Sequence, residues 1–218
     1  TCGALLLSPH ERGPCRAVES GAGRIAQADP RAVHLRVERR SGFTGRVRTK
    51  KIIAELRMRI GVVSDTHGLF DRALLRHFSG VDHILHAGDI GKRGVIEQLT
   101  QIAPVTAVSG NVDGFEASGF PVEQVLDLAG YRVALYHRLY EGGRLTRDGT
   151  GFLTRTHPAM CVYGHTHQPK VEWQEGVLLF NPGSAGPKRF HLPRAVGLLV
   201  LDSGTIDARH IVLADRAE

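Results

Sequence analysis

The chain has 218 residues, 42% of them apolar, which is enough to bury the core of one domain of ordinary size. Its apolar runs are too short to cross a membrane as a helix. The three cysteines, Cys2, Cys15 and Cys161, are too few and too scattered for a disulfide framework or a zinc cluster. This cysteine usage is typical of the reducing cytosol, so we expect a cytoplasmic protein without membrane association.

The formal net charge of +6 is unevenly distributed along the chain. Residues 1–57 contain 12 Lys and Arg against 5 Asp and Glu, a net charge of +7. Residues 58–218 contain 16 against 17, a net charge of −1. The basic character therefore belongs to the N-terminal segment, and we do not expect a nucleic-acid partner for the rest of the chain.

The N-terminal segment is rich in Arg and Gly and has little periodicity; only Ala32–Val37 suggests a strand and Lys51–Leu56 a short helix. The first Met is Met58, immediately before the first clear strand. We expect residues 1–57 to be a basic extension, either disordered or translated from upstream of a start at Met58, and residues 58–218 to be the functional domain. Two alternatives are an arm that contacts nucleic acid or an acidic partner, and an organelle transit peptide.

Strands and helices alternate from Met58 onwards. The apolar run Ile60–Val63 is typical of a strand buried on both faces. We predict strands at 59–64, 82–86 and 104–108, with helices at about 69–79 and 92–101 between them. This order is that of a βαβαβ unit, which predicts a parallel sheet.

The pattern changes in the second half of the chain. We predict a hairpin formed by 122–128 and 131–136 across Ala129-Gly130, a helix over about 145–156, and strands at 159–163, 169–174, 177–180, 195–201 and 205–212. We expect a second, mostly antiparallel sheet that packs on the first, with the helices outside. The predicted fold class is therefore α/β, as a four-layer α/β/β/α sandwich.

Five turns at strand ends carry the residue types that bind metal ions. Asp65 and His67 follow a buried strand two positions apart, so their side chains point the same way in an extended segment. Ligands of open α/β sheets bind at the carboxyl ends of the strands. A mixed set of Asp, His and Asn suits Mn, Fe, Zn, Co or Ni. The five turns are Asp65-Thr66-His67, Gly88-Asp89, Gly110-Asn111, His137 and Gly164-His165-Thr166-His167.

This set resembles the calcineurin-like metallophosphoesterase superfamily, whose signature is D-x-H, G-D, G-N, H and G-H-x-H at strand ends. It is most similar to the small, single-domain prokaryotic phosphodiesterase branch, which carries S-D-T-H-G, H-x-G-D, G-N-x-D, G-H-T-H and a late N-P-G-S. The matching segments are Ser64–Gly68, His86–Asp89, Gly110–Asp113, Gly164–His167 and Asn181–Ser184. The resemblance covers about residues 58–212, and the five motifs occur in the family's order.

The resemblance implies the metallophosphoesterase sandwich with two divalent metal ions, Mn first and Fe, Zn, Co or Ni as alternatives. Two such ions lower the pKa of a bridging water, and the bridging hydroxide attacks phosphorus. Carried over residue by residue, the first ion is bound by Asp65, His67 and His167, the second by Asn111, His137 and His165, and Asp89 bridges the two.

Two departures from the wider family pattern affect the expected chemistry. Many larger members have a His after the G-N Asn that serves as general acid, whereas Val112 stands here. The absence of that acid favours diesters or activated esters. The hairpin His is usually followed by Gly, whereas Arg138 follows His137. We expect Arg138 either to crowd the site or, like Arg189, to bind the substrate phosphate next to Asn111.

We therefore expect a metal-dependent phosphodiesterase that acts on a small phosphodiester or phosphomonoester, with Asp89, Asn111, His137 and Arg138 in catalytic roles. The alternative is a non-catalytic scaffold, because the same fold occurs in a retromer subunit with degenerate ligands. The intact ligand set argues against that alternative. A homo-oligomer is a further expectation, as are a buried packing role for His86 and a turn-fixing role for Asp113.

Overall fold

The computed structural model describes residues 57–114, 119–189 and 191–214, all within Glu38–Glu218, the second of two units into which the chain divides. The strand expected at Ala32–Val37 and the helix expected at Lys51–Leu56 lie outside the described residues. Helices α2 (Ala73–His77), α3 (Arg93–Thr100) and α4 (Arg147–Thr156) accompany two five-stranded sheets. Within the described ranges, every helix is too short or too polar to cross a membrane.

The first sheet has the strand order β12-β11-β1-β2-β3. Its strands β1 (Met58–Val63), β2 (His83–His86) and β3 (Val105–Ala107) run parallel and are connected through α2 and α3. The predicted βαβαβ unit is therefore confirmed. Helix α2 is shorter than the helix predicted at 69–79, because Leu69 closes the turn after β1 by donating its N–H to the Thr66 carbonyl at 2.9 Å.

Strands β11 (Ala195–Asp202) and β12 (Thr205–Val212) complete the first sheet, with β11 antiparallel to β1. We expected these two strands in the second sheet, and that assignment is wrong. The first five residues of β11 are all buried, which is typical of a strand covered on both faces. The continuous apolar run of β11 therefore occupies an interior position of the sheet, and the alternating β12 forms the edge.

The second sheet has the order β4-β5-β8-β10-β9. It was expected to be mostly antiparallel, but its three interior strands are parallel and only the two edges are antiparallel. The crossover through α4 between β5 and β8 makes those neighbours parallel, as a helical connection requires. The strands are β4 (Glu123–Leu128), β5 (Tyr131–Tyr136), β8 (Met160–Val162), β9 (Lys170–Gln174) and β10 (Val177–Asn181), and β6 (Tyr140–Glu141) and β7 (Arg144–Leu145) form a small separate hairpin.

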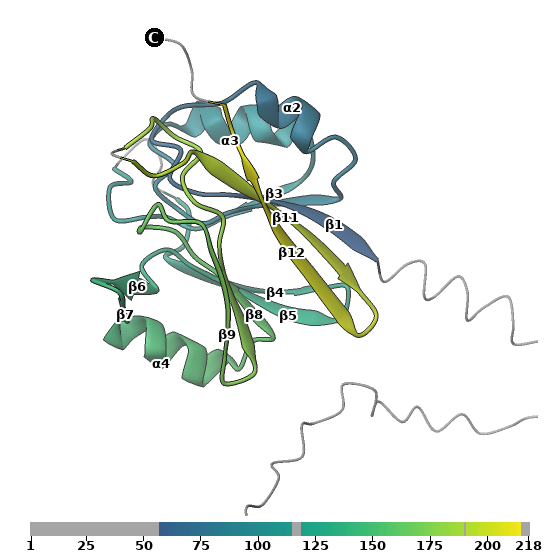
Figure 1. Ribbon diagram of the computed structural model, residues 1–218, viewed down its shortest axis with the longest axis vertical. Coiled ribbons are helices and arrows are strands. Elements are labelled where there is room, and N and C mark those ends of the chain that lie inside the picture. Colours follow the sequence, from purple (N-terminus) through teal and green to yellow (C-terminus); the bar gives the residue numbers. More distant parts are fainter. Residues whose placement is uncertain (1–56, 115–118, 190, 215–218) are drawn as a thin grey trace, which may run out of the picture. The chain divides into compact units, whose positions relative to one another are not determined.

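The layers follow the predicted α/β/β/α order, with α2 and α3 on the outer face of the first sheet and α4 on the outer face of the second (Figure 1). A central core fills the space between the sheets, and each outer helical layer has its own core. Cys161 lies in the core beneath α4. Representative buried residues are Ile60, Val62, Val133, Val162 and Leu199 between the sheets, Leu74, Val95 and Leu99 under α2 and α3, and Phe152 and Leu179 under α4.

A buried ion pair fixes the start of β11 to the segment before α2. Arg194 is 3% exposed, and its Nη2 lies 2.7 Å from Oδ2 of Asp71. The same guanidinium donates to the carbonyls of Ala185 at 2.9 Å and Gly186 at 2.7 Å. Because Gly186 in turn donates its N–H to the Asp65 carbonyl at 3.1 Å, this pair helps to position the end of β1.

We predict that Arg194→Met lowers the free energy of unfolding by about 3–5 kcal/mol, because it leaves a buried carboxylate without its guanidinium. Urea denaturation of the full chain measures the loss. The control is Arg209→Met, since the Arg209 side chain is 60% exposed and its change should cost less than about 1 kcal/mol. Equal losses in the two variants would contradict the role given to the buried pair.

Candidate metal centre

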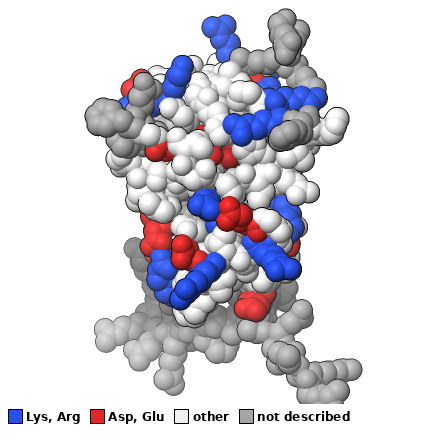
Figure 2. Space-filling model, turned by 90° about the vertical axis from the view of Figure 1, so that its left-hand side faces the viewer, with Lys and Arg blue, Asp and Glu red and all other residues white. Residues whose placement is uncertain are grey.

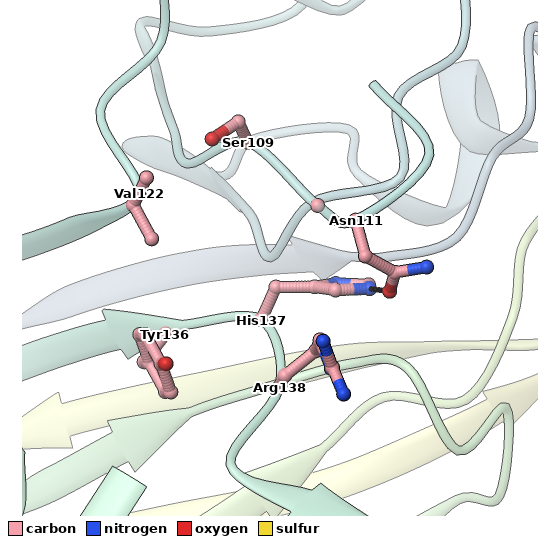
Figure 3. A pocket seen from close by; sticks show the side chains of 7 residues that line it. Ser109, Asn111, Val122, Tyr136, His137 and Arg138 are labelled. Carbon is pink, nitrogen blue, oxygen red and sulfur yellow. Dashed lines mark hydrogen bonds between the residues drawn. The ribbon is translucent and has the colours of Figure 1, made fainter. Parts of the chain in front are cut away.

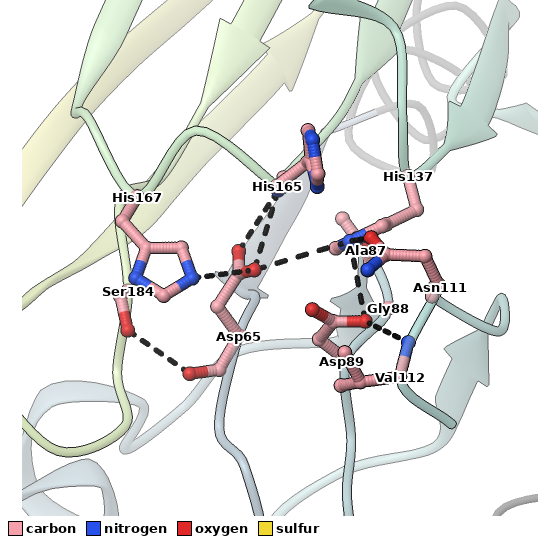
Figure 4. A network of polar contacts seen from close by, with 12 residues as sticks. Asp65, Ala87, Gly88, Asp89, Asn111, Val112, His137, His165, His167 and Ser184 are labelled. Atoms are coloured by element: carbon pink, nitrogen blue, oxygen red, sulfur yellow. Dashed lines mark hydrogen bonds and ion pairs between the residues drawn. The ribbon is translucent and has the colours of Figure 1, made fainter. Parts of the chain in front are cut away.

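The predicted turns meet at one edge of the two sheets. The turns after β1, β2 and β3 come from the first sheet, and those after β5 and β8 come from the second. Figure 4 shows their side chains pointing into one shared space between the sheets. Parallel strands from both sheets therefore place their carboxyl ends around one site, as expected for α/β proteins. On this face of the molecule, Lys and Arg side chains are interspersed with carboxylates (Figure 2).

The backbone is left-handed at each of five candidate ligands, although none of them is glycine. The φ angles are 53° at Asp65, 47° at His67, 52° at Asp89, 67° at His165 and 56° at His167. Non-glycine residues rarely adopt this region, and such strain clusters at functional sites. These turns depart from the extended geometry that we assumed for Asp65 and His67, yet they bring both side chains into the same site.

One group that could hold a metal ion consists of Asp65, His67 and His167. Oδ1 of Asp65 lies 3.1 Å from Nε2 of His167, and the Nε2 atoms of His67 and His167 lie 3.3 Å apart. Two nitrogen ligands at about 2.0–2.1 Å from a tetrahedral ion would be separated by about 3.3–3.4 Å. The donor spacing therefore fits a metal ion bound between the two rings.

The second group consists of Asp65, Asp89 and His137. Nε2 of His137 lies 3.3 Å from Oδ1 of Asp89, 4.0 Å from Oδ1 of Asp65 and 3.2 Å from Oδ1 of Asn111. On the opposite side of the ring, Nδ1 lies 2.7 Å from the Ala87 carbonyl and donates to it. This hydrogen bond fixes the tautomer in which Nε2 carries the free lone pair, which is the arrangement that a metal ligand needs.

The electrostatics of the second group follow from the mutual burial of its members. Burial raises the pKa of Asp89, but the hydrogen bond and charge of His137 outweigh it and lower the pKa to about 2. Burial likewise lowers the pKa of His137, but its contact with Asp89 and the charge of Asp65 raise that pKa above its ordinary value. The site therefore favours positive charge next to two buried carboxylates, and a divalent cation meets the same requirement.

His165 is placed differently from the other candidate ligands. Its backbone N–H donates to the Asp65 carboxylate, at 3.2 Å from Oδ2, while its ring stands edge-on to His137 with 5.5 Å between centroids. Its Nε2 lies 3.9 Å from Oε1 of Glu141, and the ring belongs to neither metal-binding group of the described residues. The structure therefore brings His165 to the site without placing its ring among the converging donors.

The two arginines proposed for phosphate binding differ in position. Burial lowers the pKa of His67, and the positive charge of Arg189 lowers it further. Nη2 of Arg138 lies 2.9 Å from both carboxylate oxygens of Glu141, at the exposed rim. Arg138 therefore does not crowd His137, and its charge is balanced by a neighbour.

Buried His86 and half-buried Asp113 support the turns as expected. His86 accepts the Gly88 N–H at Nδ1 and faces Oγ1 of Thr66 at 2.9 Å through Nε2, and burial lowers its pKa to about 4, so it is neutral at pH 7. The Asp113 carboxylate accepts the N–H groups of Gly91 at 2.8 Å and Gly110 at 2.7 Å. Asp113 thus ties the turns after β2 and β3 together.

Asn181 and Ser184 hold the site from the second sheet. The Asn181 amide is fully buried and donates to the Gly164 carbonyl at 2.9 Å and to Oγ1 of Thr166 at 3.0 Å. Ser184 Oγ donates to the Asp65 carbonyl at 3.0 Å. The N-P-G-S segment therefore positions two of the ligand turns.

Glycines permit the close approach of these turns. A Cβ on Gly110 would overlap Oδ1 and the backbone N of Asp89, and one on Gly164 would overlap Ser64 Oγ and lie 2.7 Å from Oδ2 of Asp65. Neither glycine has a positive φ, so the requirement is for space and not for backbone conformation. Any side chain at Gly110 must move the Asp89 carboxylate.

A two-sheet sandwich with carboxylate and imidazole donors at one edge defines a metallohydrolase-like protein. The sequence model of the calcineurin-like phosphoesterase superfamily domain matches residues 58–204. A probable metallophosphoesterase of Methanothermobacter thermautotrophicus is 34% identical over 161 residues, which is 71% of this chain and 92% of that protein. The chain belongs to the calcineurin-like phosphoesterase superfamily.

Solved structures share the fold. The structure titled a novel archaeal phosphodiesterase has a TM-score of 0.59 and 24% identity, and the match covers 72% of this chain and all (100%) of that one. Vacuolar protein sorting 29 from Cryptosporidium parvum has a TM-score of 0.59 and 18% identity, with 73% and 99% covered. At these identities the similarity establishes the fold.

We predict that Gly110→Ala destabilises the protein by about 1–3 kcal/mol, because the new methyl group collides with Asp89. The matched control is Gly114→Ala, since a Cβ at Gly114 meets nothing within 4 Å. Urea denaturation compares the two variants with the parent chain. Comparable stabilities of the two variants would mean that the turns can separate at little cost, contrary to this account.

Proposed function

We propose that the protein hydrolyses phosphodiester bonds with a centre of two divalent metal ions. Membership of the family supports a metal-dependent phosphoesterase. The observation that carries the finer proposal is that the two potential metal-binding groups share the buried Asp65 carboxylate. Because the two groups have one carboxylate in common, two ions bound by them would lie close together and form a single centre.

In this proposal Asp65, His67 and His167 hold the first ion, and Asn111, His137 and His165 hold the second. Asp89 would bridge the two ions: its Oδ1 lies 3.3 Å from Nε2 of His137 in the second group, and its backbone carbonyl accepts the N–H of His67 from the first at 3.0 Å. His165 needs a small ring movement toward His137 to complete the second set.

The donor set fits divalent ions of intermediate hardness, with Mn²⁺ as the first candidate and Fe, Zn, Co or Ni as alternatives. Two such ions would lower the pKa of a water molecule shared between them and withdraw charge from the phosphoryl oxygens. Hydrolysis adds this water across one P–O ester bond and yields an alcohol and a phosphomonoester. Asn111 and Arg189 are the side chains proposed to orient the phosphate, and Arg138 acts at the rim.

The leaving group is the reason to favour diesters. Val112 follows Asn111 and is 54% exposed, so a side chain without a transferable proton stands where larger members have their acid. An alkoxide leaving group is costly to expel without general-acid help. The proposal therefore favours esters of acidic alcohols and diesters over simple alkyl phosphomonoesters.

The second candidate is a protein-interaction scaffold, which the similarity to vacuolar protein sorting 29 brings into consideration. The converging donors around Asp65 favour the enzyme, because a scaffold has no need for two buried carboxylates beside three imidazoles. The cytoplasmic location and the homo-oligomeric state stay predictions from the sequence.

The test is hydrolysis of bis-p-nitrophenyl phosphate by the full chain, stripped of metal and then titrated with Mn²⁺. We expect turnover to return with Mn²⁺, and the thermal midpoint to rise because the ions bind only the folded state. Asp89→Asn should lower kcat/KM by about a hundredfold or more, because it removes a charge aimed at the reacting centre.

The matched control is Asp127→Asn, an exposed carboxylate on β4, which should leave turnover within about twofold of the parent. Full activity in Asp89→Asn would contradict the proposed centre. A folded parent chain with neither turnover nor a Mn²⁺-dependent midpoint would support the scaffold.

A further inference from the structure

Two cavities adjoin the candidate metal centre, one lined in part by Arg138 and the other by Glu141, which form an ion pair with each other. The first, here called the Tyr136 cavity, has a volume of about 220 Å³ and is lined by Ser109, Asn111, Val122, Tyr136, His137 and Arg138. The second, here called the Lys170 cavity, has a volume of about 290 Å³ and is lined by residues that include Tyr140, Glu141, His165, Thr166, Gln168 and Lys170. Each cavity therefore contains proposed ligands of the second ion.

The Tyr136 cavity has the walls of a site for a flat ring. Val122 is 62% exposed and faces the cavity together with the aromatic ring of Tyr136 (Figure 3). The guanidinium of Arg138 forms another wall. Aromatic rings pack favourably on an aromatic side chain and on a planar guanidinium.

The ion pair with Glu141 orients the Arg138 guanidinium and compensates its positive charge. Both oxygens of Glu141 accept from Nη2 of Arg138 at 2.9 Å, so this pair joins a residue that lines the Tyr136 cavity to one that lines the Lys170 cavity. Because Glu141 balances its charge, Arg138 is better suited to stack on a neutral ring than to compensate a phosphate. Asn111 and His137 close the opposite end of the cavity, where the phosphorus would lie.

The Lys170 cavity is more polar. Its cation, Lys170, lies 2.8 Å from Oε2 of Glu172 and 4.8 Å above the ring of Tyr140. Gln168 is exposed at its rim. Neither cavity alone reaches the about 300–1,000 Å³ typical of a complete ligand site, whereas two cavities that meet at one ion suit a ligand with two substituents.

We propose that the substrate is a phosphodiester with one aromatic substituent in the Tyr136 cavity and a second substituent in the Lys170 cavity. This inference rests on the proposed function and adds the substrate class and the residues that select it. Val122 and Tyr136 select the ring, and Gln168 and Lys170 border the second substituent.

The test uses unreactive esters as competitive inhibitors of bis-p-nitrophenyl phosphate hydrolysis by the Mn²⁺-loaded full chain. We expect diphenyl phosphate to bind at least about tenfold more tightly than dimethyl phosphate, because it alone fills the Tyr136 cavity. Val122→Ser and Tyr136→Leu should each reduce this ratio about threefold or more. Val212→Ser changes a side chain that is 67% exposed on β12 and should leave the ratio unchanged.

A second variant tests the second substituent separately. Gln168→Trp adds bulk at the exposed rim of the Lys170 cavity. It should therefore weaken the binding of diphenyl phosphate about fivefold or more and leave the binding of phenyl phosphate within about twofold of the parent value. Equal weakening of the diester and the monoester would overturn the two-cavity assignment.

Two further results would contradict the assignment of the Tyr136 cavity. If Val122→Ser keeps normal turnover and the parent's preference for diphenyl phosphate over dimethyl phosphate, the ring site is overturned while the proposed function stays intact. Absence of metal-dependent turnover in the parent chain would overturn the proposed function and this inference together.

Discussion

The organisation of this protein depends on the buried carboxylate of Asp65. It has no exposed surface, and a second carboxylate, Asp89, is buried close by at 3% exposure. Two buried negative charges are costly unless positive charge or several donors compensate them. The backbone N–H of His165 and the rings of His137 and His167 surround Asp65, and the proposed divalent cations would supply the remaining positive charge. The geometry of the turns and the spacing of the imidazoles are consistent with that requirement.

The fold meets this requirement by placing Asp65 at the junction of the two sheets. Strand β1 is flanked by β2 and β11, so the turn after it receives support from both sides. Gly88 and Asp89 contact it from the first sheet, and Ser184 and Gly186 bind its backbone from the segment after β10. The buried Arg194–Asp71 pair stabilises the same segment from behind. Stability and function are therefore linked here, because residues that fix the sandwich also fix the donors.

The sequence predicted the strands, the sandwich and the converging turns, because hydrophobic periodicity and the D-x-H and G-H-x-H spacings are local signals. It did not predict that β11 and β12 join the first sheet, since strand pairing depends on contacts that are distant in the chain. The left-handed turns, the displaced ring of His165 and the shared role of Asp65 are also products of tertiary packing. Val122 and Tyr136 carried no motif, and only the cavity beside Asn111 identifies them. Substrate selection is therefore the least predictable level, because it depends on side chains from separate elements.

The most direct test of the central claim is an anomalous-difference map from crystals of the full chain grown with Mn²⁺. The account predicts two peaks about 3.5–4 Å apart, one between His67 and His167 and one beside Asn111 and His137, with Asp65 and Asp89 close to both. Well-ordered crystals with a single peak, or with none at these residues, would contradict a centre of two ions.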